Sequence, residues 1–116
     1  MKKVYHLSSC STCQKIIKDL QLREKGFVLQ DIKTEKITSP QLDKMIEMAG
    51  SVDPLFSTKA IKYRELGLKD KKLTDREKKD YILSEYTFLK RPVIIVSLKI
   101  FAGSSSETIS RVKSIL

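Results

Sequence analysis

The sequence predicts an α/β fold in which a mixed sheet is flanked by helices, and three observations lead to this prediction. Strand-like and helical apolar patterns alternate near the N-terminus. The continuous apolar run Val93–Val96 is typical of a central strand that is buried on both faces. The residues between these two parts, about 39–88, carry mainly helix signals and predict a helical insertion.

The first 32 residues predict a strand, a loop, a helix and a second strand. Residues 2–7 have strand propensity, and a polar loop follows them. Apolar residues then recur at helical spacing over residues 13–20, with Gly26 as the stop signal of that helix. Residues 27–32 predict the second strand, which a right-handed crossover would make parallel to the first.

The helical insertion contains two helix starts. Ser39 is the expected N-cap of the first helix, with Pro40 at its first helical position and Gly50 at its end. Thr74 and Glu77 fit a capping box that opens a second helix running to about residue 84. These signals predict helices and no strand in this part of the chain.

The C-terminal part predicts two strands and a helix. Pro92 precedes the run Val93–Val96, and a tight connection leads to a short antiparallel strand over residues 100–102. Ser104 and Glu107 offer a capping box for the last helix. The whole order is β-α-β, a helical insertion and β-β-α, which is the thioredoxin-like (glutaredoxin-type) arrangement in a single domain of residues 1–116.

Composition excludes several classes of protein. The chain has 23 Lys and Arg against 14 Asp and Glu, a formal net charge of +9, but both signs are mixed along it. Without a basic stripe or arm, the charge predicts a solvated surface or a protein-binding face and no direct binding of nucleic acid. No apolar run is long enough to span a membrane, and the N-terminus does not resemble a signal peptide. We therefore expect a soluble, cytoplasmic protein that is a monomer.

Both cysteines fall in one motif, Cys10-Ser-Thr-Cys13, between the first strand and the first helix. Cys-x-x-Cys near a βαβ pattern is typical of redox motifs. A thiol at a helix N-terminus faces free backbone N–H groups and the positive end of the helix dipole, which stabilise a thiolate. Cys10 is therefore the candidate nucleophile, and Cys13 would resolve a mixed disulfide or a sulfenic acid on it.

Three other interpretations of the cysteines stay open at this point. A structural disulfide would close so short a loop that it would stabilise little. Zinc needs about four ligands, and the chain offers two Cys and His6, so we expect no metal. Two inert buried cysteines are the third alternative.

The chain resembles the ArsC-like proteins, which include the glutaredoxin-coupled arsenate reductases and the Spx/MgsR regulators. The resemblance covers essentially the whole chain. It is carried by four segments in order: Tyr5-His-Leu-Ser-Ser-Cys-Ser-Thr-Cys-Gln-Lys15, Leu55-Phe-Ser-Thr58, Lys62-Tyr-Arg-Glu-Leu-Gly-Leu-Lys69 and Lys90-Arg-Pro-Val-Ile-Ile-Val96. It implies a thioredoxin-like sheet with a helical insertion and a cis peptide between Arg91 and Pro92.

The resemblance also implies roles for individual residues. Cys10 would be the nucleophile, Cys13 the resolving thiol, and Arg91 a guanidinium facing the Cys10 thiolate or an oxyanion. The implied substrate-binding residues are Ser11, Thr12, Thr58, Lys59 and Pro92.

Two departures from the arsenate reductase pattern matter for function. Those enzymes use three arginines on the oxyanion, and the positions of two of them fall near Ser57 and Ser104, where this chain has no arginine. Lys59 would supply a point charge in place of one of them. Those reductases also often lack the equivalent of Cys13, whereas the regulator branch carries a Cys-x-x-Cys switch. Both departures point away from arsenate and toward dithiol–disulfide chemistry.

The sequence leaves two functions open besides a fold that has lost its activity. The first is a thiol oxidoreductase of the arsenate reductase (glutaredoxin) type, with no bound cofactor, reduced by glutathione, glutaredoxin or thioredoxin. The second is a Spx/MgsR-like regulator that binds the C-terminal domain of the RNA polymerase α subunit. Gly50 resembles the glycine on the polymerase-contact face of those regulators. His6 is expected to be a strand residue and not a base.

Overall fold

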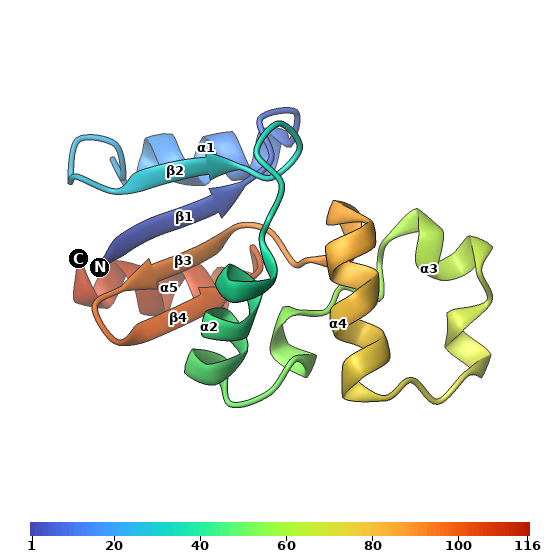
Figure 1. The fold of residues 1–116 in the computed structure, drawn as a ribbon. Helices are drawn as coiled ribbons and strands as arrows, with labels where there is room; N and C mark the ends of the chain where they lie inside the picture. The colour runs from blue at the N-terminus through green and yellow to red at the C-terminus, as the bar shows by residue number, and fades with distance from the viewer. The chain divides into compact units, whose positions relative to one another are not determined.

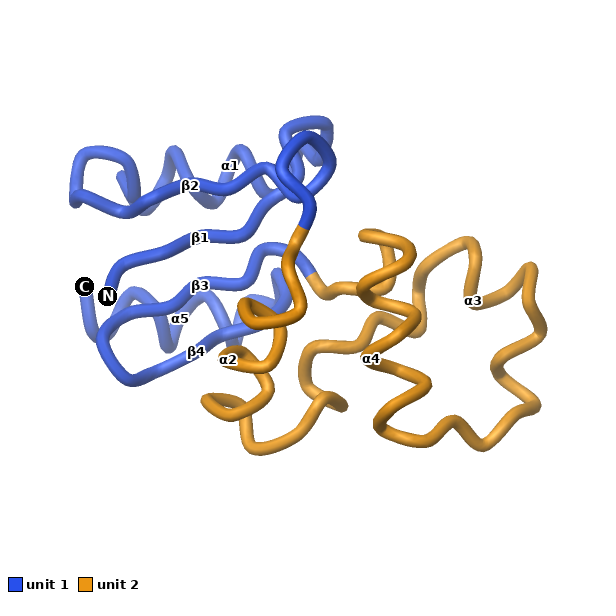
Figure 2. The backbone as a smooth tube through the Cα atoms, in the orientation of Figure 1, with its two compact units in different colours: residues 1–36, 91–116 blue, residues 37–90 orange.

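A computed structural model describes residues 1–116, and the chain divides into two compact units (Figure 2). Unit 1 contains residues 1–36 and 91–116, and unit 2 contains residues 37–90. Unit 2 matches the predicted helical insertion closely at both ends. The insertion therefore interrupts unit 1, whose sheet is assembled from the two ends of the chain.

Unit 1 is built on a four-stranded sheet with the order β2-β1-β3-β4 (Figure 1). The strand β1 (Lys2–His6) pairs in parallel with β2 (Val28–Asp31) and antiparallel with β3 (Val93–Val96). The fourth strand, β4 (Lys99–Ala102), is antiparallel to β3. The predicted mixed sheet is confirmed, including the parallel first pair and the antiparallel last pair.

Two helices of unit 1, α1 (Ser11–Asp19) and α5 (Ser106–Ile115), lie on the same side of the sheet, behind it in Figure 1. The core between these layers is apolar and contains Val4, Ile16, Ile17, Leu20, Leu22, Phe27, Ile94 and Val112. In β3, Val93, Ile94 and Ile95 are at most 1% exposed, so this strand is buried on both faces as predicted.

The first helix ends earlier than predicted. It stops at Asp19, and the chain runs through turns to Gly26, which lies two residues before the start of β2. Ile16, Leu20 and Leu22 are all buried in one core. At about 100° per residue, a continued helix would turn Leu22 about 120° away from Ile16 and about 160° away from Leu20. Burying Leu22 therefore requires the chain to leave the helix.

The expected N-cap of α2 (Ser39–Ala49) is wrong by one residue. Thr38 is the N-cap, and its hydroxyl accepts a hydrogen bond from the Gln41 backbone while the Gln41 side chain accepts one from the Thr38 backbone. Ser39 is already helical. The reciprocal capping box satisfies two backbone N–H donors at the helix start. Ser39 as the N-cap could not form such a box, because the residue at its N3 position is neither Glu nor Gln. The predicted end is confirmed, since Gly50 adopts a left-handed conformation with φ of 87°.

The predicted N-cap of α5 also moves by one residue, from Ser104 to Ser105. The Ser105 hydroxyl accepts a hydrogen bond from the Thr108 backbone. Glu107 is then one position too early for a capping box, and its carboxylate pairs with Arg111 at 2.6 Å.

Unit 2 contains α2, α3 (Ile61–Glu65) and α4 (Asp75–Ser84), together with the short 3-10 helices η1 (Asp53–Leu55), η2 (Leu68–Asp70) and η3 (Tyr86–Phe88). The predicted capping box of Thr74 and Glu77 opens α4 and is confirmed. An aromatic cluster packs inside this unit: the Phe56 and Phe88 rings stack with centroids 5.5 Å apart, and Tyr63 and Tyr81 pack on them.

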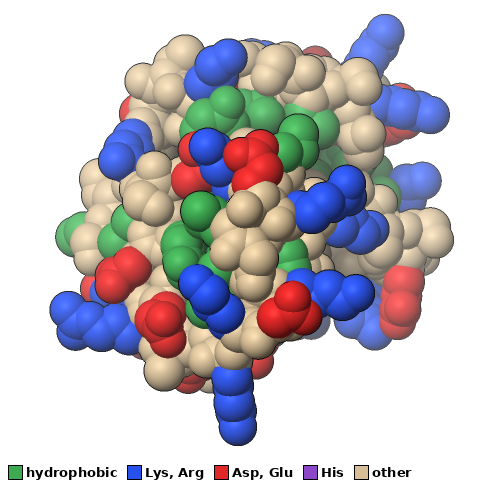
Figure 3. All heavy atoms as spheres, turned by 90° about the vertical axis from the view of Figure 1, so that its right-hand side faces the viewer, with side chains coloured by type: hydrophobic (Ala, Val, Ile, Leu, Met, Phe, Trp, Pro, Cys, Tyr) green, Lys and Arg blue, Asp and Glu red, His purple; other side chains and the backbone are tan.

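Charged side chains of both signs are intermixed on the face shown in Figure 3. Lys and Arg do not gather there into a stripe of one sign. None of the helices combines the length and the apolar composition that crossing a bilayer would need.

Candidate redox site

The candidate site is built around the N-terminus of α1. Cys10 is the N-cap of this helix and has an extended backbone with φ of −91° and ψ of 109°. Its backbone N–H donates to the Leu7 carbonyl at 2.9 Å, which closes the loop that follows β1. Its own carbonyl accepts from the Gln14 N–H at 3.1 Å as the first bond of the helix. The predicted placement of Cys10 at the helix start is confirmed.

Cys13 lies one turn further along the helix and is fully buried. Burial is the main cause that raises the pKa of the Cys13 thiol to about 11, and its closeness to Cys10 raises it further. The Leu7 backbone and the positive charge of Arg91 act in the opposite direction. Cys13 is therefore a neutral thiol at pH 7.

Cys10 is half-buried, and its pKa moves the other way. Burial by itself would raise this pKa, but hydrogen bonds from the backbone and thiol of Cys13, the charge of Arg91 and the Thr12 backbone together hold it below its ordinary value. The backbone donors of Thr12 and Cys13 lie in the first turn of α1, where free N–H groups stabilise a thiolate. The site therefore separates two chemically identical thiols into a more acidic one and a less acidic one.

Arg91 enters the site from the residue pair that precedes β3. The Arg91–Pro92 peptide bond is cis, as the resemblance implied. The charge of Arg91 lowers the pKa of both thiols. Arg91 and the two cysteines all belong to unit 1, although about 80 residues of chain separate them.

Six of the eight residues predicted for the site belong to unit 1, and Thr58 and Lys59 belong to unit 2. Ser11 and Thr12 are the first two residues of α1 and are exposed. Thr58 lines a hollow of about 430 Å³ within unit 2, and the Lys59 backbone donates to the Ser57 hydroxyl at 3.3 Å. The roles of Thr58 and Lys59 in the site stay predictions.

The structure adds two neighbours of Cys10 to those that the sequence suggested. Leu7 accepts the backbone hydrogen bond of Cys10, and the Gln14 side chain donates to the same Leu7 carbonyl at 3.0 Å. The residue types Leu and Gln do not indicate these contacts. The only signal in the sequence is that the two residues lie close to the Cys-x-x-Cys motif, one before it and one after it. His6 is a buried residue of β1, as predicted, and burial is the main cause that lowers its pKa.

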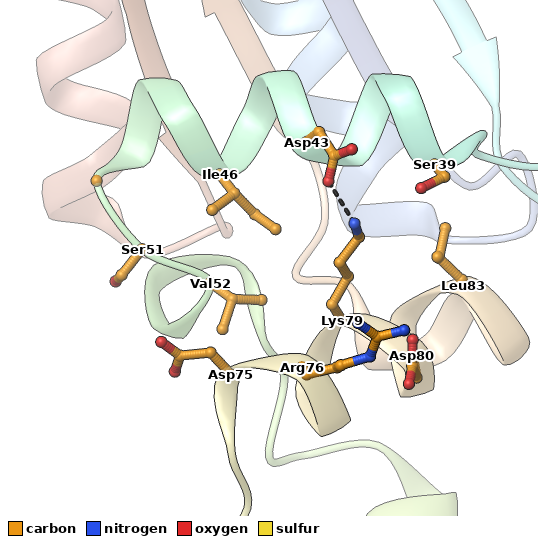
Figure 4. Close-up of a pocket in the computed structure, with 11 residues that line it drawn as sticks. Ser39, Asp43, Ile46, Ser51, Val52, Asp75, Arg76, Lys79, Asp80 and Leu83 are labelled. Carbon is orange, nitrogen blue, oxygen red and sulfur yellow. Dashed lines mark ion pairs between the residues drawn. The ribbon is translucent and has the colours of Figure 1, made fainter.

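A second hollow of about 520 Å³ lies in unit 2 between α2 and α4 (Figure 4). Ile46, Val52 and Leu83 supply its apolar side chains. Asp43 and Lys79 form an ion pair of 2.5 Å across it. It holds no thiol and no histidine, so it is separate in its chemistry from the cysteine site.

Comparisons with known proteins agree with the fold. The global transcriptional regulator Spx of Lactiplantibacillus plantarum is 22% identical over 109 residues, covering 93% of this chain and 83% of the relative. The solution structure of a Staphylococcus aureus protein is 33% identical, with a TM-score of 0.75 and coverage of 96% and 97%.

An arsenate reductase from Vibrio cholerae shares the fold, with a TM-score of 0.78, 18% identity and coverage of 99% and 98%. The thioredoxin-like arrangement predicted from the order of elements is therefore confirmed. The model of the ArsC family matches residues 5–112, which is nearly the whole chain. The protein belongs to the ArsC family.

Proposed function

We propose that this ArsC-family protein is a thiol–disulfide oxidoreductase in which Cys10 attacks and Cys13 resolves. The observation that carries the proposal is the contrast between the two thiols: the pKa of Cys10 is lowered at the helix N-terminus, whereas burial raises that of Cys13 to about 11. An attacking thiol needs thiolate character and access, and the half-buried Cys10 has both. A resolving thiol must stay protonated until the first step has taken place.

In the first step the Cys10 thiolate attacks one sulfur of a substrate disulfide. A Cys10–substrate disulfide forms, the substrate S–S bond breaks, and the second substrate sulfur leaves as a thiolate that takes up a proton. The Cys13 thiol then loses its proton and attacks the Cys10 sulfur. The Cys10–Cys13 disulfide forms and the remaining substrate thiolate leaves, so the substrate gains two electrons and the protein loses two.

Two glutathione molecules can close the cycle. One glutathione thiolate attacks the Cys10–Cys13 disulfide, the second attacks the resulting mixed disulfide, and the products are the dithiol protein and glutathione disulfide. Glutaredoxin or thioredoxin would supply the same two electrons. Arsenate is not the expected substrate, because only Arg91 remains of the three arginines that the resemblance implies.

A redox titration in glutathione buffers tests the proposal, with the Cys10–Cys13 disulfide measured by mass after alkylation. We expect one reversible two-electron transition in the wild type. Cys10→Ser abolishes turnover of a mixed glutathione disulfide substrate. Cys13→Ser retains the attack and traps a Cys10–glutathione adduct. If the wild-type protein forms no intramolecular disulfide at any glutathione ratio, the proposal is wrong.

A redox-switched regulator is the second candidate, and the match with the Spx regulator favours it. Gly50 lies at the C-terminal end of α2, beside the hollow between α2 and α4. In this proposal the Cys10–Cys13 disulfide changes a binding surface for the C-terminal domain of the RNA polymerase α subunit. Calorimetry of that domain against the reduced and the oxidised protein tests it. Absence of binding in both states contradicts it.

A further inference from the structure

Gln14 directly follows Cys13, and its half-buried side chain joins α1 to the end of β1. Its amide nitrogen Nε2 lies 3.0 Å from the Leu7 carbonyl oxygen and 3.1 Å from Nδ1 of His6. A single side-chain group therefore contacts both residues that precede the cysteine loop.

These two contacts fix the direction of each hydrogen bond. A carbonyl oxygen only accepts, so the Gln14 atom beside Leu7 is the NH₂ group and not the amide oxygen. The NH₂ group has two hydrogens, and the second points to His6. Nδ1 of His6 must then be an acceptor, which places the proton of the neutral ring on Nε2.

We propose that Gln14 is a positioning residue for Cys10: its amide holds the Leu7 carbonyl and locks His6 in the neutral tautomer protonated at Nε2. The inference rests on the proposed function, since the position of Cys10 matters because Cys10 is the nucleophile.

The backbone of Leu7 connects the Gln14 side chain to both cysteines. The Leu7 carbonyl also accepts the Cys10 N–H at 2.9 Å, and the Leu7 backbone donates toward the Cys13 sulfur. The Gln14 backbone donates to the Cys10 carbonyl. Gln14 thus holds the loop through its side chain and its main chain together, and loss of the side-chain contact would loosen the Leu7 carbonyl that accepts the Cys10 N–H.

The surroundings of His6 agree with a neutral ring. Burial is the main cause that lowers the pKa of His6, the Asp31 carboxylate on β2 raises it, and Arg23 in the turns after α1 lowers it. Protonation at Nδ1 would place two donors, the ring N–H and the Gln14 NH₂, against each other. The Gln14 contact therefore adds to the resistance of His6 to protonation.

The tautomer of His6 is the first measurement. His6 is the only histidine of the chain, so its ring nitrogens give unambiguous signals in long-range ¹H–¹⁵N NMR of the wild-type protein. We expect the proton on Nε2 at pH 7. A proton on Nδ1 would overturn the inference without any variant having to fold.

Two variants test the effect on Cys10. Gln14→Leu removes both donated bonds, and we expect the rate of Cys10 alkylation at pH 7 to fall about fivefold, which corresponds to one ordinary hydrogen bond. In Gln14→Glu the carboxylate cannot donate to Leu7 and accepts from a protonated His6, so the pKa of His6 rises above that of the wild type. Lys18→Gln, an exposed change on the same helix, is the matched control and leaves both readouts unchanged.

The readouts separate this inference from the proposed function. Thiol alkylation and the His6 titration require no disulfide exchange, so they report on Gln14 even if the protein turns over no substrate. Far-UV circular dichroism establishes that each variant is folded. If both folded Gln14 variants keep the wild-type pH profile of Cys10 alkylation, the inference is overturned.

Discussion

The two units of this protein differ in where their polar groups lie. In unit 1 the thiols and His6 are partly or fully buried, and their pKa values are shifted mainly by burial, hydrogen bonds and nearby charges. In unit 2 the charged groups lie at the surface, in ion pairs such as Lys78–Asp53 and Lys79–Asp43, and its one shifted carboxyl, that of Glu77, belongs to a helix cap.

This difference shows which part of the chain is built for chemistry. Burial of a titratable group costs stability unless hydrogen bonds or charges compensate, and unit 1 concentrates such groups at one helix N-terminus. Unit 2 uses its polar groups to begin helices and to pair on the surface, and it is held by an aromatic cluster. The following changes test whether stability and thiol chemistry are separable between the units.

The largest expected effect is on the stability of unit 2. Phe88 is 1% exposed and stacks on Phe56, so Phe88→Ala should lower the free energy of unfolding by about 3–5 kcal/mol. Urea unfolding measures this loss, and Phe88→Leu, which leaves a smaller cavity, should lose less. We expect hydrogen exchange to accelerate mainly in residues 37–90. Equal acceleration in unit 1, or a changed Cys10 pKa in the folded variant, would break the comparison.

A change in unit 1 should alter thiol chemistry and leave stability nearly intact. The positive charge of Arg91 helps to hold the pKa of Cys10 below its ordinary value, so Arg91→Met should raise that pKa and move the alkylation profile to higher pH. At pH 7 the alkylation rate then falls, since less thiolate is present. Arg91→Lys retains the charge and is the control. An Arg91→Met profile that superimposes on the wild type would exclude this electrostatic role.

Helix caps should matter about equally in both units. Thr74→Ala removes the N-cap of α4 in unit 2, and Ser105→Ala removes that of α5 in unit 1. Each should cost about 1 kcal/mol of stability in thermal or urea unfolding, because a backbone N–H loses its acceptor. Thr74→Ser keeps the hydroxyl and should cost less than Thr74→Ala. A cost near zero for either alanine variant would show that its cap is not formed in solution.

The smallest expected effect comes from the ion pair of the hollow in unit 2. Asp43 is 58% exposed and Lys79 is 29% exposed, so a double-mutant cycle of Asp43→Asn and Lys79→Met should give a coupling of about 0.5 kcal/mol that weakens in high salt. Lys62 and Glu65 are the control pair and should couple less, because they lie 3.8 Å apart and their lysine is more exposed than Lys79. Salt-independent coupling in the Asp43–Lys79 cycle would contradict this account.

Local patterns predicted most elements because local physics controls them. The apolar run Val93–Val96, the capping box at Thr74 and the helix end at Gly50 are each decided by a few neighbouring residues. The errors fall at element boundaries, where one residue can satisfy the pattern as well as the next. The early end of α1 is a different case, because burial of Leu22 in the core overrides the helical pattern.

The sequence by itself determined the thioredoxin-like order of elements and the Cys-x-x-Cys motif at a helix start, because both follow from spacing along the chain. It could not decide which neighbours surround the two sulfur atoms, since Arg91 comes close to them only through the pairing of β1 with β3, two strands that lie far apart in the sequence. The opposite pKa shifts of Cys10 and Cys13 depend on burial and on donors that only the folded chain brings together. Gln14 lies in a segment that carries the family resemblance, but its residue type does not reveal the two hydrogen bonds that its side chain makes with His6 and Leu7.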